Sequence, residues 1–206
     1  MEPDPVSNPS GEPASLTAEA ELIARAKGGD LRAFDELVLQ HQQTVFAVAL
    51  RMLGDRDEAQ DTAQDVFVRA YRGFASFRQE AKLSTWLVSI TMNLCRNRRR
   101  WWMRRRRVIA ASLDEAAENG ERTLGEQIAD PAPSPAAAAE RSDQARMIMA
   151  ALQMLDEADR TVIVLRDIQG YAYEEIGEML RWPLGTVKSR ISRARLQLRA
   201  LLNGRL

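Results

Sequence analysis

The chain has 206 residues with 29 basic and 29 acidic side chains, so its formal net charge is zero, which alone argues against a nucleic-acid partner. Its single cysteine, Cys95, excludes an internal disulfide and suits a reducing cytoplasm, and no apolar run is long enough to cross a bilayer. One histidine and one cysteine cannot make a metal cluster, and Gly28-Gly29-Asp30 lacks the ending of a phosphate loop, so we expect no metal site and no cofactor.

The neutral total hides a segregation of charge along the chain. Residues 96–107 contain eight arginines, whereas residues 112–143 carry eight acids against two arginines. Residues 181–206 contain seven basic side chains and no acidic one. Because basic and acidic blocks alternate, the chain can present strongly basic surfaces in spite of its net charge.

The N-terminal half is predicted to be helical almost throughout. Residues 1–15 hold four prolines and few apolar side chains, and we expect a disordered tail there. Residues 16–110 show apolar side chains at helical spacing, interrupted by a break at residues 73–82. We expect helices to begin or end at Asp30, at Gly54, at Asp55 or Asp57, and at Ser84 or Thr85.

A linker and a second helical unit follow. Residues 111–142 combine three prolines, an alanine run and an acidic excess, which is typical of a flexible linker. Residues 143–206 return to helical spacing, and the β-branched stretch 161–165 lies between helical flanks, so we expect a helix there as well. The predicted fold class is therefore all-α, with two small helical domains joined by an acidic, proline-containing linker.

The second unit ends in a predicted helix-turn-helix. Ile176, Met179 and Leu180 mark the first helix, and Pro183 and Gly185 interrupt the chain before the second. The second helix carries one apolar stripe, and its other positions are mostly Lys, Arg and Ser, which suit a major groove lined with phosphates and base acceptors. The stripe consists of Val187, Ile191, Ala194 and Leu198.

An acidic helix face in the first unit has two interpretations. Asp57, Asp61, Gln64 and Asp65 share one side of their helix, opposite its apolar stripe. A charged face alone favours a solvated surface, whereas the alternative is a docking face for a basic partner.

The arginine block and the preceding loop also allow two interpretations each. Arginines interleaved with Trp101 and Trp102 suit unpaired nucleic acid, and this is favoured over a solubilising helix end because eight close like charges repel one another. The loop 74–82 and the following helix carry aromatics and amides that could hold a flipped base. Such aromatics are more often core, and the residue pattern alone leaves this choice open.

Taken together, these segments resemble an extracytoplasmic-function bacterial sigma factor, group IV of the sigma-70 family. The resemblance covers about residues 20–202 apart from the linker. In the first unit it rests on Asp61-x-x-Gln64-Asp65-Val66-Phe67-x-x-Ala70-Tyr71, Phe77-Arg78 and Thr85-Trp86-Leu87-x-x-Ile90-x-x-Asn93. In the second it rests on Leu155-x-x-x-Asp159-Arg160, Leu165-Arg166-Asp167, Gly170-Tyr171-x-Tyr173-Glu174-Glu175-Ile176 and Gly185-Thr186-Val187-Lys188-Ser189-Arg190-Ile191-x-Arg193-Ala194-Arg195.

The resemblance implies a non-enzymatic specificity subunit that binds core RNA polymerase and directs initiation at promoters. The implied partners are the clamp of the largest polymerase subunit, the flap of the second-largest subunit, promoter DNA and an anti-sigma factor. Docking on core polymerase is implied for Asp61, Gln64 and Asp65. Contact with melted −10 DNA is implied for Phe74, Phe77, Arg78, Trp86, Asn93, Asn97, Arg96, Arg98, Arg99 and Arg100. Reading of the −35 duplex is implied for Thr186, Lys188, Ser189, Arg190, Ser192 and Arg193.

Other function classes account for less of the sequence. An operator-binding regulator would explain the helix-turn-helix but not the acidic face, the aromatic loop and the arginine block together. An RNA-binding protein would use only the Arg/Trp segment, and an enzyme would need a nucleophile–base pair that the sequence does not offer. The loop 78–82 departs from the family pattern by lacking a glycine after the arginine, which leaves its base preference open.

Overall fold

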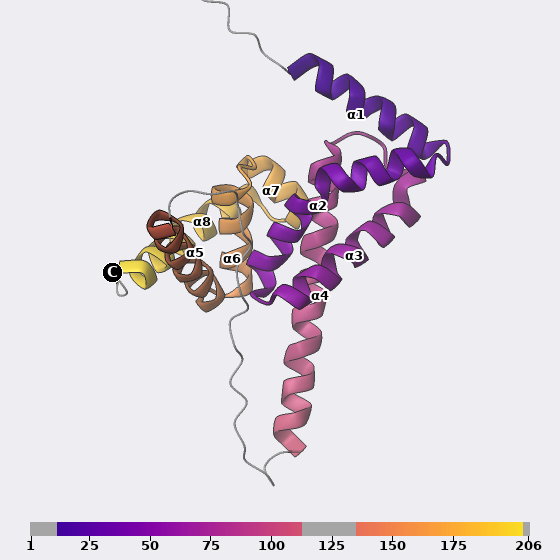
Figure 1. Cartoon of the computed structure of the whole chain (residues 1–206). Helices are drawn as coiled ribbons and strands as arrows, with labels where there is room; N and C mark the ends of the chain where they lie inside the picture. Colours follow the sequence, from indigo (N-terminus) through magenta and orange to yellow (C-terminus); the bar gives the residue numbers. More distant parts are fainter. Residues whose placement is uncertain (1–11, 113–134, 204–206) are drawn as a thin grey trace, which may run out of the picture.

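The computed structural model describes residues 12–112 and 135–203, and within these ranges every regular element is helical. The first range forms one unit and the second range forms another (Figure 1). Most of the predicted disordered tail and most of the predicted linker lie outside the described residues, but a helix begins at Glu12, so the prediction of disorder is wrong for residues 12–15. The elements are α1 (Glu12–Lys27), α2 (Leu31–Leu53), α3 (Arg56–Gly73), η1 (Phe74–Ser76), α4 (Leu83–Ser112), α5 (Pro135–Met154), α6 (Glu157–Ile163), η2 (Val164–Ile168), α7 (Tyr173–Leu180) and α8 (Leu184–Asn203).

Caps that are visible in the sequence set the helix ends of the first unit. The Asp30 carboxylate accepts hydrogen bonds from the backbone N–H groups of residues 32 and 33, and the Asp55 carboxylate accepts one from residue 58. Gly54 ends α2 in the left-handed conformation, at φ 77°, where glycine has no side chain to strain. These three boundaries confirm the predictions, but α4 begins at Leu83, so the predicted cap at Ser84 or Thr85 is wrong.

In the first unit, α2, α3 and α4 pack on one another, with α1 on α2. Their apolar sides enclose a core that includes Leu37, Val66 and Leu87. The C-terminal half of α4, which carries the arginine block, extends away from the bundle (Figure 1). The arginines are thereby displayed on a helix that its neighbours cover only in part.

The second unit contains the predicted helix-turn-helix in α7 and α8. Arg181 takes the left-handed conformation, at φ 55°, and ends α7. A Cβ at Gly177 would lie 3.1 Å from the carbonyl oxygen of Trp182, so glycine permits this close approach of the turn. Val187, Ile191 and Ala194 are buried, which confirms the apolar stripe of α8.

One helix boundary differs from the linker prediction. α5 begins at Pro135, within the segment expected to be a linker. Proline is well tolerated in the first turn of a helix, because the N–H it lacks has no partner there. The alanines that follow are strong helix formers, so the run predicted as linker extends the helix instead.

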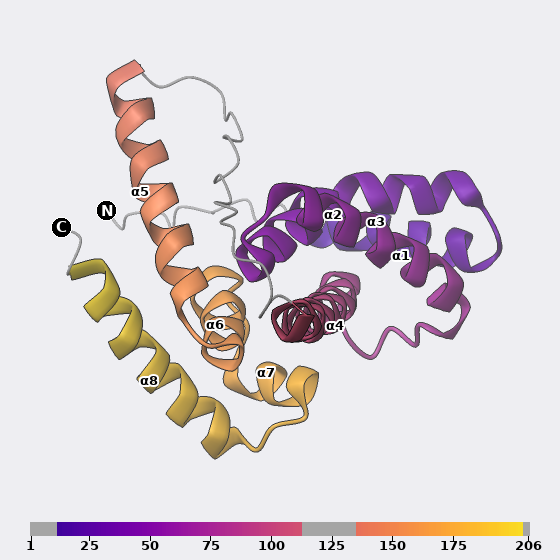
Figure 2. The ribbon, with the colours of Figure 1, turned by 90° about the horizontal axis from the view of Figure 1, so that it is seen from below.

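The two units pack directly against each other. Val48 and Met52 of α2 and Met92 of α4 belong to the same buried cluster as Leu152 of α5 and Val162 of α6. Seen from below, α6 and α7 lie between α8 and the first unit (Figure 2). The sequence predicts two units joined by a linker, and the structure adds an apolar interface between them.

Candidate functional site

The exposed side of α3 carries the three residues predicted to dock a partner. Asp61, Gln64 and Asp65 are all exposed, opposite the buried Val66. An Arg98 nitrogen lies 3.3 Å from an Asp61 carboxylate oxygen, and another lies 3.8 Å from one of Asp65. The two acidic side chains remain 65% and 61% exposed, so this face still presents its negative charge to solvent.

The side chain of Arg98, a residue of α4, is paired with residues of α3. Its guanidinium also forms an ion pair with Glu58 and donates a hydrogen bond of 2.9 Å to the Thr62 hydroxyl. Sequence reasoning assigned Arg98 to −10 DNA together with its neighbours. In this arrangement its donors are engaged by α3, so Arg98 joins α4 to α3.

The aromatic residues of the loop form part of the core. Phe74 and Phe77 are only 4% and 5% exposed, and the Phe77 ring stacks on Trp86 with the centroids 4.9 Å apart. Phe74 and Phe77 are therefore core residues in this arrangement, as the core alternative has it, and their contact with −10 DNA stays a prediction. The exposed residues of the loop, Arg78 among them, remain available for contact.

A groove of about 1050 Å³ runs between this loop, α4 and α7. The loop and α4 line one side, which brings together five of the residues predicted to meet −10 DNA: Phe77, Arg78, Trp86, Asn93 and Arg96. Glu175 and Glu178 of α7 line the other side. The first unit therefore contributes a mainly basic wall, in which Glu80 is the one acid, and the second unit a mainly acidic one, in which Arg181 lies with the two glutamates.

The remaining predicted contacts lie along the arginine block. Asn97 and Arg100 are exposed, and Arg99 is partly buried beside a small pocket of about 210 Å³. The Arg96 Nε lies 3.5 Å from an oxygen of Glu157 in α6. The structure thus spreads these side chains along more than one turn of α4 and ties one of them to the second unit.

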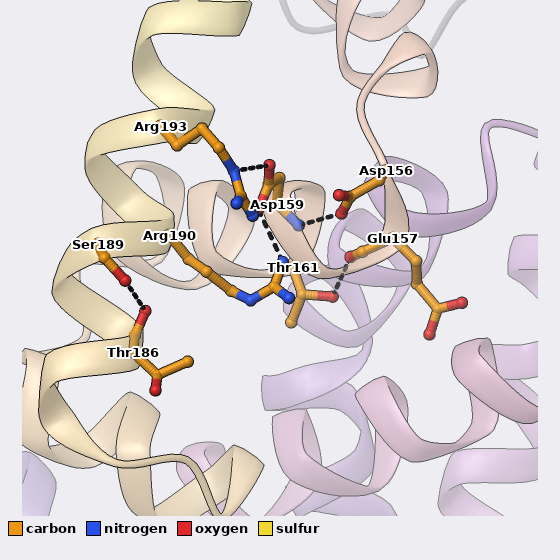
Figure 3. Close-up of polar contacts among 8 residues, drawn as sticks. All are labelled: Asp156, Glu157, Asp159, Thr161, Thr186, Ser189, Arg190 and Arg193. Atoms are coloured by element: carbon orange, nitrogen blue, oxygen red, sulfur yellow. Dashed lines mark hydrogen bonds and ion pairs between the residues drawn. The ribbon is translucent and has the colours of Figure 1, made fainter.

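The residues predicted to read duplex DNA divide into two groups on α8. Lys188, Ser189 and Ser192 are exposed, and the partly buried Thr186 accepts a hydrogen bond from the Ser189 hydroxyl through its backbone carbonyl. Arg190 and Arg193 both point to one carboxylate in α6 (Figure 3).

That carboxylate belongs to Asp159, which is part of the family motif but had no role predicted from the sequence. Its side chain is fully buried. Burial acts to raise the pKa of Asp159, but hydrogen bonds from Arg193 and Arg190 outweigh it, and the pKa lies below its usual range. Because the pKa is depressed in the fold, the pair stabilises the protein above the pKa of an unfolded aspartate, about 4, and this stability is lost as the pH falls through the folded value.

Both halves of the chain match models of known protein regions. Residues 37–107 match Sigma-70 region 2, and residues 145–198 match Sigma-70, region 4. The RNA polymerase sigma-H factor of Pseudomonas aeruginosa is 37% identical over 177 residues, covering 86% of this chain and 90% of the relative. The ECF RNA polymerase sigma factor SigW of Bacillus subtilis is 36% identical over 180 residues, covering 87% and 94%.

The chain belongs to the sigma-70 family, as a sigma factor of the extracytoplasmic-function (ECF) type. It therefore directs promoter-specific initiation of transcription by RNA polymerase. Two solved structures share its fold with a TM-score of 0.61 each. CnrH in complex with the cytosolic domain of CnrY is 29% identical and covers 91% of this chain and 98% of that chain. RpoE in complex with the anti-sigma factor NepR from Bartonella quintana is 26% identical and covers 82% and 96%.

A second motif residue of this sigma factor with no role predicted from the sequence is Arg160, which holds the two units together. Its side chain is fully buried and donates hydrogen bonds to the backbone carbonyls of Leu152, Gln153 and Leu155 at 2.7, 2.7 and 3.1 Å. A fourth bond, of 2.6 Å, reaches the carbonyl of Met52 in the first unit. Burial lowers the pKa of Arg160 to about 9, which leaves the guanidinium charged at neutral pH.

Cys95 packs in the shared core of the sigma factor. Burial raises the pKa of its thiol to about 12, so it stays protonated and unreactive at neutral pH. Within the described ranges, no group of three or more His, Cys, Asp or Glu side chains could hold a metal ion. The described helices also include none that is long and apolar enough to cross a membrane.

Proposed function

We propose that this sigma factor, as a group IV member, docks on core RNA polymerase through the α3 face and reads promoter DNA with both units. In this proposal the predicted domain of residues 16–110 serves docking and −10 recognition, and that of residues 143–206 serves −35 recognition. The α3 face binds the clamp of the largest subunit, while the second unit binds the flap of the second-largest subunit. The observation that carries this proposal is one chain with an exposed acidic face, a basic groove wall and a separate basic α8.

The two DNA-reading steps require different chemistry. On the −35 duplex, α8 enters the major groove with Lys188, Ser189 and Ser192 toward the bases. On melted −10 DNA, the groove beside Asn93 receives an unstacked base, and arginines of α4 pair with phosphates. Unstacking costs a few kcal/mol, which these contacts must offset. Because both units sit on one polymerase, the second contact is intramolecular and modest affinities suffice.

The packing of the two units makes promoter binding depend on their separation. The groove that we assign to −10 DNA is lined on its other side by Glu175 and Glu178, whose charges repel phosphates. We propose that docking on polymerase separates the units and removes this acidic wall. An anti-sigma factor, such as NepR in the complex with RpoE, would instead keep the sigma factor inactive in the cytoplasm or at the inner face of the membrane.

Gly54→Ala is expected to weaken the packing of the two units. A Cβ there would lie 2.5 Å from Cδ of Gln153, which donates a hydrogen bond of 2.9 Å to the Arg51 carbonyl across the interface. The measurement is energy transfer between dyes on cysteines introduced at two exposed positions, Gln40 of α2 and Gln197 of α8. We expect lower transfer in the free variant than in the wild type, and a similar drop when wild type binds core polymerase.

Gly170→Ala is the matched control for this change. Gly170 has a φ of +78°, close to the +77° of Gly54, but nothing lies within 4 Å of its added Cβ. Both substitutions carry similar backbone strain, about 1–2 kcal/mol, and only one disturbs the interface. Equal transfer in the two variants would show that Gly54 does not control the packing of the units.

Asn93→Ala is expected to slow promoter opening about 3- to 10-fold while leaving closed-complex formation unchanged. Its side chain is exposed and lines the groove, and a lost hydrogen bond to the captured base is worth about 1 kcal/mol. Permanganate reactivity of −10 thymines measures the opening. Gln43→Ala, exposed on α2 and outside the groove lining, is the comparison. Equal opening rates for wild type and Asn93→Ala would show that this groove does not bind the captured base of −10 DNA.

Footprinting separates this proposal from an operator-binding regulator. The purified chain is incubated with promoter fragments with and without core polymerase. We expect protection of specific −35 and −10 sequences only when polymerase is present, because the isolated basic surfaces give weak, salt-sensitive binding. Sequence-specific protection by the purified chain alone would favour the regulator instead.

A further inference from the structure

One edge of the Arg193 guanidinium is fixed by Asp159. Arg193 Nε donates to Oδ2 of Asp159 at 3.1 Å, and its Nη2 donates to Oδ1 at 2.9 Å (Figure 3). These two parallel bonds make a bidentate pair, which restrains the guanidinium in its plane. The carboxylate is fully buried, so it cannot move toward solvent with the arginine.

The other edge of the same guanidinium is left for a ligand. Arg193 Nη1 makes no hydrogen bond within the described part of the chain, and the side chain is 53% exposed. Arg190 differs, because it is 30% exposed and its guanidinium lies 5.2 Å from the Trp182 ring centroid while Nη1 binds Asp159 at 3.0 Å. Of the two arginines, only Arg193 has both a bidentate bond that restrains its guanidinium and an exposed edge that a ligand can reach.

We propose that Asp159 is a positioning residue for −35 recognition, which rests on the proposed role of α8. It fixes Arg193 so that the open edge of the guanidinium, Nη1 with the second N–H of Nη2, meets a guanine in the major groove. The same carboxylate keeps Arg190 out of base reading. A bidentate arginine–guanine contact discriminates against other bases by about 5- to 150-fold.

This role differs from structural support in what it predicts for binding. Replacing Asp159 by asparagine removes one negative charge beside two arginines, so affinity for phosphates of any sequence rises or stays the same. At the same time Arg193 regains its rotamer freedom and loses its preference for one base. A purely structural role would instead lower specific and non-specific binding together.

The test uses the full chain reconstituted with core polymerase on a promoter library that is randomised in the −35 element. Transcripts are sequenced through barcodes to give the base preference at each −35 position. The variants are Asp159→Asn, Arg193→Lys and the two combined. The control is Asp167→Asn, which releases Arg195, an arginine on the opposite flank of α8 whose Nε lies 3.0 Å from Asp167 Oδ2.

We expect Asp159→Asn and Arg193→Lys to lose about 5- to 150-fold preference at the same one or two adjacent positions and to keep the others. The double variant should lose no more than either single variant, and Asp167→Asn should keep the wild-type profile. An unchanged Asp159→Asn profile, or equal loss at every position, would overturn the inference. If Asp159→Asn fails to fold, an unchanged Arg193→Lys profile would overturn it. A wild type without any −35 preference would overturn the proposed function of α8 and this inference with it.

Discussion

Reversing the charge of Asp61 and Asp65 together to lysine is expected to weaken binding of the chain to core RNA polymerase by at least about 30-fold. A charge lost from a desolvated interfacial pair costs about 2–5 kcal/mol, and 2 kcal/mol corresponds to about 30-fold. The fold should survive, because the ion pairs of these two exposed acids with Arg98 are worth about 0–1 kcal/mol each. The measurement is the equilibrium affinity of labelled chain for core polymerase.

The matched control reverses two exposed acids elsewhere in the same unit. Asp35→Lys with Glu36→Lys on α2 changes the net charge by the same amount, but outside the α3 face. We expect its affinity for polymerase to stay within about threefold of wild type, as long-range charge effects are screened by physiological salt. Equal affinities for the α3 double variant and the wild type would show that this face does not dock on polymerase.

Arg160→Ala is expected to lower the free energy of unfolding by about 3–5 kcal/mol. The substitution leaves four backbone carbonyls without their buried donor, one of them on Met52 in the other unit, and it opens a cavity. Losing one partner of a buried charged network costs an amount of this order. Urea unfolding at pH 7, followed by circular dichroism, measures the change.

Two further variants give the Arg160 prediction its controls. Arg199→Ala removes an exposed arginine of α8 and should change the free energy of unfolding by less than about 0.5 kcal/mol. Arg160→Lys keeps the charge but offers fewer donors, so its stability should fall between wild type and Arg160→Ala. A loss below about 1 kcal/mol for Arg160→Ala would mean that neighbouring groups or water replace its hydrogen bonds.

The parts of this fold that depend on local sequence could be predicted. The caps at Asp30 and Asp55, the stop at Gly54 and the apolar stripe of α8 each follow from neighbouring residues. The start of α4 was misplaced because two candidate caps, Ser84 and Thr85, lie just inside the helix. Local rules therefore gave the element types and most of the boundaries that were tested.

The site residues that sequence reasoning missed depend on contacts between distant segments. Asp159 meets Arg193 only because α6 packs against α8, and nothing in the local pattern marks that acid as buried. Arg160 follows Asp159 in the family motif, but its bond to Met52 requires the two units to be packed together. The burial of Phe77 against Trp86 likewise comes from the fold of the loop onto α4.

The blocks of like charge were visible in the sequence, but the ion pairs that neutralise some of the arginines were not. Residues 96–107 suggest a uniformly basic helix end, yet Arg96 and Arg98 have acidic partners on α6 and α3. Residue composition counts charges, whereas the basic surface open to DNA depends on which of them are paired. The arginines predicted to contact −10 DNA therefore differ in how freely they can do so.

Run-off transcription with purified core polymerase over a library of genomic fragments tests the central claim most directly. The two reactions differ only in the presence of this chain. We predict new transcripts in its presence, starting downstream of a shared pair of −35 and −10 sequences. The same start sites and yields in both reactions would contradict the claim that this chain gives polymerase its choice of promoter.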